Sequence, residues 1–314
     1  MKIKKLYFFY GGKKGIKKKT MECLQQGADL LGIPTESCGN AKEFGQKNDY
    51  DFSSKNEYGV QLGYLPQRDS LIEKNFKKNL FFIERNIMLD YQNATSALTK
   101  KYYKICLGSI YHELSQKIKI PNDVLKAKQK DFYENFDIDI SKKQTQGKNI
   151  LILFNKPHGF GTHDINGDAI GWGLRKIREL RSAGFKNKID IRFHPVTHAG
   201  VKEETLTKAN QQSGNVHLLG GKVFYNVLKR DNYLCAIGYN TSALVTCFME
   251  GIPTWVDCNT NILYKYSHIK KVSDINNLNI NMNSKQKFLD EYINDIWSTE
   301  DMKKGLVWKT YLQN

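Results

Sequence analysis

The sequence has no long apolar run. No window of its 314 residues approaches the roughly eighteen consecutive apolar side chains of a membrane-spanning helix, so we expect no transmembrane segment. The six cysteines show neither the spacing of a zinc site nor that of a disulfide framework, which predicts reduced thiols in a cytoplasmic protein. Acidic residues are also few: 32 Asp and Glu stand against 48 Lys and Arg, a formal net charge of +16.

The residues that are abundant are those of a globular core. Hydrophobic residues make up 40% of the chain and aromatic residues 12%, a composition that excludes a disordered chain. A chain of this length favours two domains over one. The positive charge favours anionic partners and speeds their encounter. Eight lysines lie within residues 2–19, where the segment KKGIKKK is either a solvated basic loop or a phosphate-binding one.

The first half of the chain has the pattern of a parallel sheet. We expect a strand over residues 4–12, which ends in two glycines, and a helix with one apolar face over 18–31. Further strands are expected at 58–62 and 79–84. Because strand, glycine turn, helix and strand in this order are typical of doubly wound α/β folds, we expect a Rossmann-like domain over residues 1–140.

The same pattern restarts after a polar, linker-like stretch. An apolar run at 148–154 predicts a buried parallel strand. The elements expected after it are a helix at 172–183, strands at 188–193, 216–219 and 234–238, a helix at 242–250 and a strand at 254–256. We therefore expect a second Rossmann-like domain over 148–283. The last residues, 284–314, predict one or two helices that can cross back to the first domain.

Three loops of the second domain carry groups suited to binding, because ligands of α/β sheets bind at the carboxyl ends of the strands. The first loop, 155–171, is rich in Gly, His and Asp. Its residues His158, Gly159 and Gly161 can either approach a ligand closely or form a long surface turn.

The second loop begins with Arg192-Phe193-His194-Pro195. Alternation along a strand sends Arg192 and His194 to the same side, where a guanidinium and an imidazole suit a diphosphate. An Arg-x-His pair on its own is more often an ordinary surface pair.

The third loop follows the strand at 234–238. Four polar residues open the next helix there: Tyr239, Asn240, Thr241 and Ser242. They either cap the helix or leave its first amides to bind an anion. Glu250 stands at the other end of this helix, where a negative charge is unfavourable for the helix dipole.

The order of these motifs, a Gly-rich loop, R-x-H-P, Y-N-T-S and then E-G-I-P, resembles the donor-binding half of GT-B glycosyltransferases. Capsule-type transferases and the glycosyltransferase-like proteins of tailed bacteriophages, which modify DNA bases, are the most similar. Trp172 and the final pattern W…E…G..W, which begins at Trp297, follow the phage proteins. The first loop departs from them, since it reads PHGFGTHD where they more often have a Gly-Gly-Trp run.

The resemblance implies two α/β domains and transfer of a sugar from a nucleotide-sugar, expected to be a UDP-sugar, to an acceptor hydroxyl. Arg192, His194 and the helix start at Thr241 and Ser242 would stabilise the diphosphate leaving group, and Glu250 would accept hydrogen bonds from donor hydroxyls. Because the protein meets this charge, no metal is required.

A metal site has one weak candidate in the sequence. His158, His163 and Asp164 are the right residue types, but they lack a spacing that places them on one face. We therefore expect no resident metal.

An inverting transferase also needs a base for the acceptor proton. Glu84, at the end of an expected strand, is the first candidate and Asp90 the second. Glu84 is equally suited to an ion pair with Arg85 or a nearby lysine. A retaining enzyme would need no such base.

Two acceptors fit a shared donor site. The first is a hydroxymethylated base, such as hydroxymethylcytosine, flipped out of double-stranded phage DNA in the cytoplasm of the host cell. The candidates for the DNA contact are Lys13, Lys14, Lys17, Lys18, Lys19, Lys77, Lys78, Lys100 and Lys101. The second is a capsule or lipopolysaccharide glycan. A third alternative is a non-catalytic nucleic-acid-binding protein.

Overall fold

The computed structural model describes the chain in segments. These are residues 3–10, 14–39, 56–63, 72, 74–85, 101–108, 120–136, 138–141, 147–157, 160–220, 224–228, 233–278 and 283–312. The chain divides into two compact units. Unit 1 comprises Met1–Leu89, Ala94–Phe136 and Leu289–Asn314, and unit 2 comprises Asp90–Asn93 and Asp137–Phe288. No helix in the described segments combines the length and the apolar character that crossing a membrane requires.

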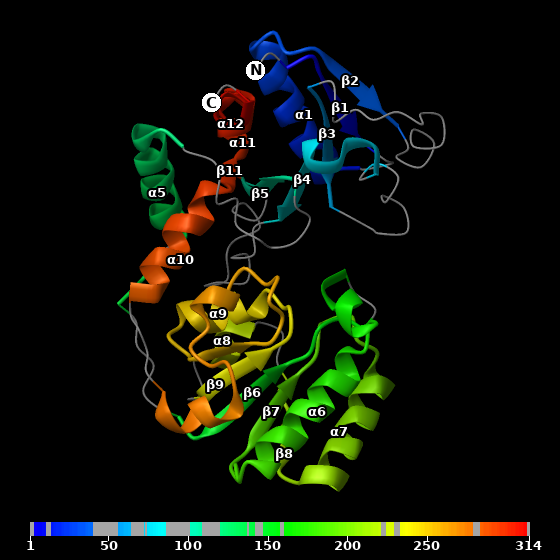
Figure 1. Ribbon diagram of the computed structural model, residues 1–314, viewed down its shortest axis with the longest axis vertical. Helices are drawn as coiled ribbons and strands as arrows, with labels where there is room; N and C mark the ends of the chain where they lie inside the picture. Colours follow the sequence, from blue (N-terminus) through cyan, green and yellow to red (C-terminus); the bar gives the residue numbers. More distant parts are fainter. Residues whose placement is uncertain are drawn as a thin grey trace. The chain divides into compact units, whose positions relative to one another are not determined.

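Unit 1 is built on a mixed sheet (Figure 1). Its strands are β1 (Lys5–Phe9), β2 (Thr35–Cys38), β3 (Glu57–Leu62), β4 (Leu80–Arg85), β5 (Tyr102–Leu107) and β11 (Ile296–Ser298). They lie in the order β11-β5-β4-β3-β1-β2. Strands β2, β1, β3 and β4 run parallel, whereas β5 and β11 are antiparallel to their neighbours. The chain goes from β1 to β2 on one side and to β3 on the other, as in doubly wound sheets.

Helices cover one face of this sheet and flank its β11 end. On one face lie α1 (Ile16–Leu30), α11 (Thr299–Lys303) and α12 (Leu306–Leu312), and α11 and α12 are the red helices beside the blue α1 in Figure 1. Helices α5 (Asn122–Phe136) and α10 (Asn283–Asn294) lie at the β11 end of the sheet, where Val124 and Leu125 of α5 pack against the same core as α1. There the ring of Phe132 packs at 5.9 Å from Tyr102 and 6.2 Å from Tyr292.

The C-terminal residues belong to the core of unit 1. Trp308 is fully buried, and its indole Nε1 donates to the Leu24 carbonyl of α1 at 2.8 Å. The sequence predicts only helices here, but the structure contains the strand β11, which pairs with β5. Its three residues are too short for a periodic signal, which explains why the strand escapes sequence-based prediction.

Unit 2 is built on a fully parallel sheet. Its strands are β6 (Asn149–Leu153), β7 (Ile189–Arg192), β8 (Val216–Leu218), β9 (Tyr233–Gly238) and β10 (Thr254–Val256). They lie in the order β10-β9-β6-β7-β8. The chain moves outward from β6 to β8 and then returns to the other side of β6 at β9. The topological switch point of this sheet therefore lies between β6 and β9.

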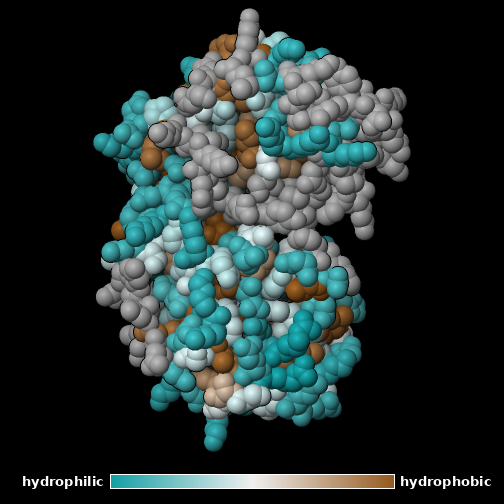
Figure 2. All heavy atoms as spheres, in the orientation of Figure 1, coloured by the Kyte–Doolittle hydropathy of each residue, from teal (hydrophilic) through white to brown (hydrophobic). Residues whose placement is uncertain are grey.

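Helices cover both faces of the unit 2 sheet (Figure 1). The helices are α6 (Ala169–Ser182), α7 (Ala199–Ser213), α8 (Phe224–Leu228) and α9 (Ala243–Met249). In the described part of the chain, 3-10 helices are η2 (Lys77–Asn79) in unit 1 and η4 (Phe160–Ile165), η5 (Tyr264–Tyr266) and η6 (Val272–Asn277) in unit 2. Hydrophilic side chains make up much of the coloured surface in Figure 2. The chain is thus an α/β protein with two Rossmann-like sheets and a helical C-terminal segment that returns to the first sheet.

Several elements lie outside the sequence-based expectations. Strands β2 and β5 and helices α7 and α8 are among them. Helix α7 buries only Thr205 and Ala209, so it lacks the apolar periodicity that identifies a helix in a sequence.

Candidate functional site

At the switch point of unit 2, two asparagines join the loop after β6 to the loop after β9 by reciprocal hydrogen bonds. Asn155 follows β6 and Asn240 follows β9. The Asn155 side-chain amide donates to the Asn240 carbonyl at 2.7 Å and accepts from the Asn240 backbone N–H at 3.2 Å. Asn261 adds a third amide, which donates to the Asn240 side chain at 2.9 Å. These bonds hold the two loops that a ligand at this edge would meet.

The Gly-rich loop is also fixed to the loop after β9. A Cβ atom on Gly161 would lie 3.1 Å from the Asn240 carbonyl oxygen, so this glycine serves a close approach to the protein itself. Asp164 accepts a short hydrogen bond from the Tyr239 hydroxyl. Burial and this bond to a carboxylate raise the pKa of Tyr239, which keeps the phenol protonated. Tyr239 is thus a structural anchor of the loop.

Arg192 ends β7 on the face that α8 and α9 cover. It is half-buried, and its guanidinium lies 4.9 Å from the centre of the Phe224 ring. In the register of the sheet Arg192 pairs with Leu153 of β6, which in turn pairs with Gly238 of β9. Its backbone therefore lies one strand away from the switch point.

His194 lies two residues further on and is exposed. Its Nδ1 accepts from the backbone N–H of Val196 at 3.3 Å. A neutral His194 ring in this arrangement carries its proton on Nε2, which makes that nitrogen a donor.

Thr241 and Ser242 differ in how they start α9. The Thr241 hydroxyl accepts from the Ala243 N–H at 3.3 Å, a local turn bond. Ser242 stands at the N-cap position but makes no side-chain capping hydrogen bond, and it is exposed. Simple capping therefore accounts for Thr241 but not for Ser242.

Glu250 lies at the C-cap of α9 and is only 6% exposed. Burial raises the pKa of the neighbouring Cys247 thiol, and the Glu250 carboxylate raises it further, whereas Arg192 lowers it. The thiol therefore lies within electrostatic reach of both charged groups.

Glu84 of unit 1 stands opposite Lys104 in the β4–β5 register. Lys104 is 2% exposed, and burial works against its ammonium. The neighbouring groups of Cys106, Asp295 and Glu84 outweigh that cost and raise the pKa of Lys104. Lys104 and Asp295 are buried polar residues that the sequence analysis missed. Their burial depends on the packing of β5 and of the α10–β11 turn, which the local sequence does not reveal.

The predicted DNA-binding lysines divide between two edges of the unit 1 sheet. Lys14, Lys17, Lys18 and Lys19 follow β1 and are exposed, with Lys18 paired to Glu22 at 3.6 Å. Lys101 precedes the antiparallel β5 at this same edge and contacts Asp131 at 3.2 Å. By contrast, Lys77 and Lys78 precede β4 and lie at the opposite edge. The topology thus does not place all of these lysines together.

Five predicted site residues lie outside the described segments: Lys13, Asp90, Lys100, His158 and Gly159. Within those segments, no group of three or more His, Cys, Asp or Glu side chains is arranged to hold a metal ion. All six cysteines fall within them and are free thiols.

No protein-family model and no curated protein matches this chain. Among solved structures, it is similar to a Listeria monocytogenes protein described as a UDP-N-acetylglucosamine 2-epimerase, with 10% identity, 100% of this chain and 98% of that chain covered, and a TM-score of 0.31. A Mycobacterium tuberculosis shikimate dehydrogenase is 6% identical, with 97% of this chain and 99% of that chain covered and a TM-score of 0.24. A shikimate 5-dehydrogenase of Listeria monocytogenes, in complex with shikimate and NAD, is 9% identical, with 97% of this chain and 96% of that chain covered and a TM-score of 0.24. At these TM-scores the likenesses carry no argument about activity.

Proposed function

We propose that the protein is a GT-B glycosyltransferase, which moves a sugar from a nucleotide-sugar to a hydroxyl group of an acceptor. The observation that carries the proposal is the grouping of Arg192, His194 and Ser242 at the carboxyl edge of the unit 2 sheet. These three residues end β7, follow it or follow β9, next to the topological switch point, where α/β sheets bind their ligands.

The chemistry of these groups suits a diphosphate leaving group. Negative charge grows on the diphosphate as the bond between the sugar and its oxygen breaks, and Arg192 and the Nε2–H of His194 would stabilise it. The exposed Ser242 hydroxyl would add a further donor. Glu250 lies at the opposite end of α9 from Ser242; its proposed role, accepting hydrogen bonds from hydroxyl groups of the donor, comes from the resemblance to GT-B enzymes. No step in this scheme needs a metal ion.

Glu84 is the proposed base for the acceptor proton, with Asp90 as the second candidate. Its position at the carboxyl end of β4 supports this role, since that edge is where the parallel strands of unit 1 present their loops. The buried Lys104, which stands opposite Glu84, supports the alternative, in which Glu84 forms a structural ion pair and takes no part in catalysis.

For the acceptor we propose a hydroxymethylated base in double-stranded phage DNA. The support is electrostatic: the chain carries a net charge of +16, and four exposed lysines lie together around the start of α1. A capsule or lipopolysaccharide glycan is the second candidate. It fits the same donor chemistry, but it gives the exposed lysines no role.

The test is a transfer assay on DNA. The purified chain is incubated with a duplex that contains hydroxymethylcytosine and with UDP-, ADP-, GDP- and dTDP-glucose in turn, and the DNA is digested to nucleosides for mass spectrometry. We expect a nucleoside heavier by one hexose residue with one donor. Hydrolysis of a donor without a DNA adduct would exclude this acceptor and keep the glycosyltransferase, whereas no response to any nucleotide-sugar would contradict the proposed function.

A further inference from the structure

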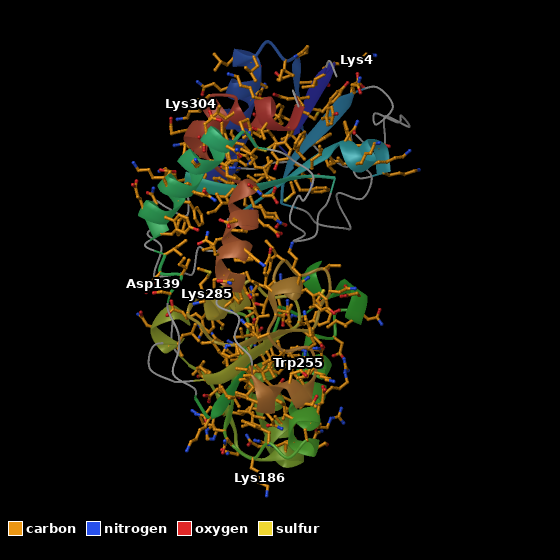
Figure 3. The ribbon with its side chains drawn as sticks, turned by 60° about the vertical axis from the view of Figure 1, so that its left-hand side comes forward. Lys4, Asp139, Lys186, Trp255, Lys285 and Lys304 are labelled. Carbon is orange, nitrogen blue, oxygen red and sulfur yellow. The ribbon has the colours of Figure 1, made fainter. Side chains whose placement is uncertain are left out.

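The loop after β10 packs against the loop after β9. Figure 3 labels Trp255 on β10, and the chain continues from there to Asn261. The backbone N–H of Cys258 donates to the Tyr239 carbonyl at 3.2 Å, and that of Asn261 donates to the Cys258 carbonyl at 3.2 Å. These bonds bring the Asn261 side chain, which is only 6% exposed, to the side chain of Asn240. The edge that carries the predicted site thus includes a residue that no sequence motif marks.

The backbone fixes which way the Asn261 amide points. An N–H group can only donate, so the atom that accepts from the Leu263 N–H at 2.8 Å is the Asn261 Oδ1. The Asn261 Nδ2 therefore faces Asn240, and it donates to the Asn240 Oδ1 at 2.9 Å. Exchange of the two amide atoms would set an N–H against an N–H at one contact and an oxygen against an oxygen at the other.

Asn240 is oriented in turn and presents its Nδ2 as a donor. Its backbone N–H and carbonyl are both bonded to Asn155, and its Oδ1 accepts from Asn261. Among the described residues, nothing accepts from its Nδ2, and this nitrogen is not one of the unpaired atoms that the fold seals off from solvent. A Cβ atom on Gly161 would lie 3.4 Å from this nitrogen, so the glycine leaves that side of the donor uncovered.

The groups around this donor suit a ligand with anionic oxygens. Arg192 ends β7 and His194 follows it, at the same carboxyl edge of the sheet. The Arg192 guanidinium and the Nε2–H of His194 can only donate, as the Asn240 Nδ2 does. Donors gathered at one edge favour a ligand with several acceptor oxygens, and a diphosphate is such a ligand.

We infer that Asn261 is a positioning residue of the donor site: its amide holds the Asn240 side chain so that Nδ2 donates to a phosphate oxygen of the nucleotide-sugar. The inference rests on the proposed function, in which this edge of unit 2 binds the donor diphosphate. It adds that the loop after β10 sets the direction in which the site offers its hydrogen bonds.

One conservative substitution reverses this direction. Asn261→Asp keeps the size of the side chain and can still accept from the Leu263 N–H, but it offers Asn240 an oxygen in place of an amide nitrogen. The Asn240 amide must then turn over, donate from Nδ2 to the new carboxylate and face the ligand with its Oδ1. Asn259→Asp is the matched control, because it adds the same charge to the same loop at an exposed position.

The test is isothermal titration calorimetry on the full chain at pH 8. It measures binding of inorganic pyrophosphate and of the nucleotide-sugar that the wild type binds most tightly among UDP-, ADP-, GDP- and dTDP-glucose. We expect Asn261→Asp to weaken both by about tenfold or more, the usual effect of losing a hydrogen bond to a charged group. Asn259→Asp should stay within about twofold of the wild type, since an exposed charge is screened. In an Asn240→Ala background, Asn261→Asp should weaken binding by no more than about threefold, the part due to its charge alone.

Three results would overturn the inference. Asn261→Asp could bind both probes like Asn259→Asp, or its loss could remain in full in the Asn240→Ala background, as that of a merely structural change would. It could also weaken the nucleotide-sugar alone, which would mean that Asn240 does not contact phosphate.

Thermal melts show whether the variants fold. If Asn261→Asp does not, Asn261→Ala replaces it, because it releases the Asn240 amide without adding a charge. A loss of about threefold is then expected, and it should vanish in the Asn240→Ala background. A wild type that binds no nucleotide-sugar would instead refute the proposed function, and the inference with it.

Discussion

Several cationic side chains of this protein donate to carbonyl groups at the ends of helices. Lys128 donates to the Asn294 carbonyl at the end of α10 at 2.8 Å, and Lys285 donates to Met249 at the end of α9. Arg181 donates to the carbonyl groups of Ser213, the last residue of α7, and of Gly214 and Asn215 after it, and to those of Phe185 and Asn187 in the loop after α6. The last carbonyls of a helix have no partner within it, so Lys128, Lys285 and Arg181 supply hydrogen bonds to such groups at the ends of α10, α9 and α7.

Loss of the Arg192 side chain should lower activity without lowering the stability of the fold. We expect Arg192→Ala to lower the rate of sugar transfer by about 100-fold, the usual effect of removing one donor that stabilises developing charge. Its melting temperature should change little, since Arg192 is only half-buried. Steady-state kinetics and a thermal melt provide the measurement, with Arg178→Ala, an exposed arginine of α6, as the control. Full activity in Arg192→Ala would remove this residue from the site.

His268 should make the protein sensitive to acid. Its pKa is lowered from 6.5 to about 4 by burial and by two lysines, so between these values the unfolded chain binds a proton that the folded chain does not. The free energy of unfolding should therefore fall as the pH drops from 6.5 to 4, by at most about 3 kcal/mol from this group.

Urea titrations at pH 7 and pH 4.5 measure this contribution as a difference between the wild type and His268→Asn. The asparagine carbonyl can still accept from the Thr254 N–H, as the Nδ1 of His268 does at 3.4 Å. The variant should lose less stability between the two pH values than the wild type. Equal losses would show that His268 does not titrate in this range.

At the scale of elements, the packing of α1 against the C-terminal segment depends on a glycine. A Cβ atom on Gly27 would lie 1.9 Å from the Met302 carbonyl and 3.0 Å from Gly305, so the backbones of α1 and the α11–α12 turn touch directly. Helical glycines are normally unfavourable, which makes the close approach the reason for this one.

Gly27→Ala should therefore destabilise unit 1, despite the better helix propensity of alanine. We expect a loss of about 2–4 kcal/mol in the free energy of unfolding, because the added methyl group meets backbone that cannot move aside. Gly200→Ala is the matched control: its Cβ would meet only His198, at 3.5 Å, near the start of α7. That variant should be neutral or slightly stabilised. Chemical denaturation of both variants measures the change in the free energy of unfolding. An unchanged value for Gly27→Ala would show that the backbone of α11 does not lie against Gly27.

The strands of unit 2 also show which features local sequence patterns can predict. The expected strands at 188–193, 234–238 and 254–256 correspond to β7, β9 and β10 within a residue or two, since each is a short apolar run between turn residues. The predicted loops accordingly lie at the carboxyl ends of these strands. Their hydrogen bonds were not predictable, because the Asn155–Asn240 pair joins residues 85 positions apart.

At the scale of the whole molecule, the excess of positive charge has a measurable consequence. Binding to DNA releases counterions, so the logarithm of the affinity should fall linearly with the logarithm of the salt concentration, by about 0.9 for each phosphate contacted. We expect the triple variant Lys17→Ala/Lys18→Ala/Lys19→Ala to reduce this slope by one to three such contacts. Fluorescence anisotropy with a labelled duplex at several salt concentrations gives the slope.

The control uses the other edge of the same sheet. Lys77→Ala/Lys78→Ala removes two exposed lysines at the amino end of β4, away from the start of α1. Its slope should equal that of the wild type if DNA contacts the α1 edge. An unchanged slope in the triple variant, or a reduced one in this control, would contradict the proposed DNA contact at the α1 edge.

The sequence by itself determined the two α/β units, their main strands and the loops that carry Arg192, His194 and Ser242. These features depend on apolar runs, turn residues and helix spacing, all of which are local. Only the tertiary structure decided the pairing of β11 with β5, the burial of Lys104 and Lys285, and the close approach at Gly27. The physical reason is that burial and pairing depend on which distant segments meet, and a local pattern of residue types does not contain that information.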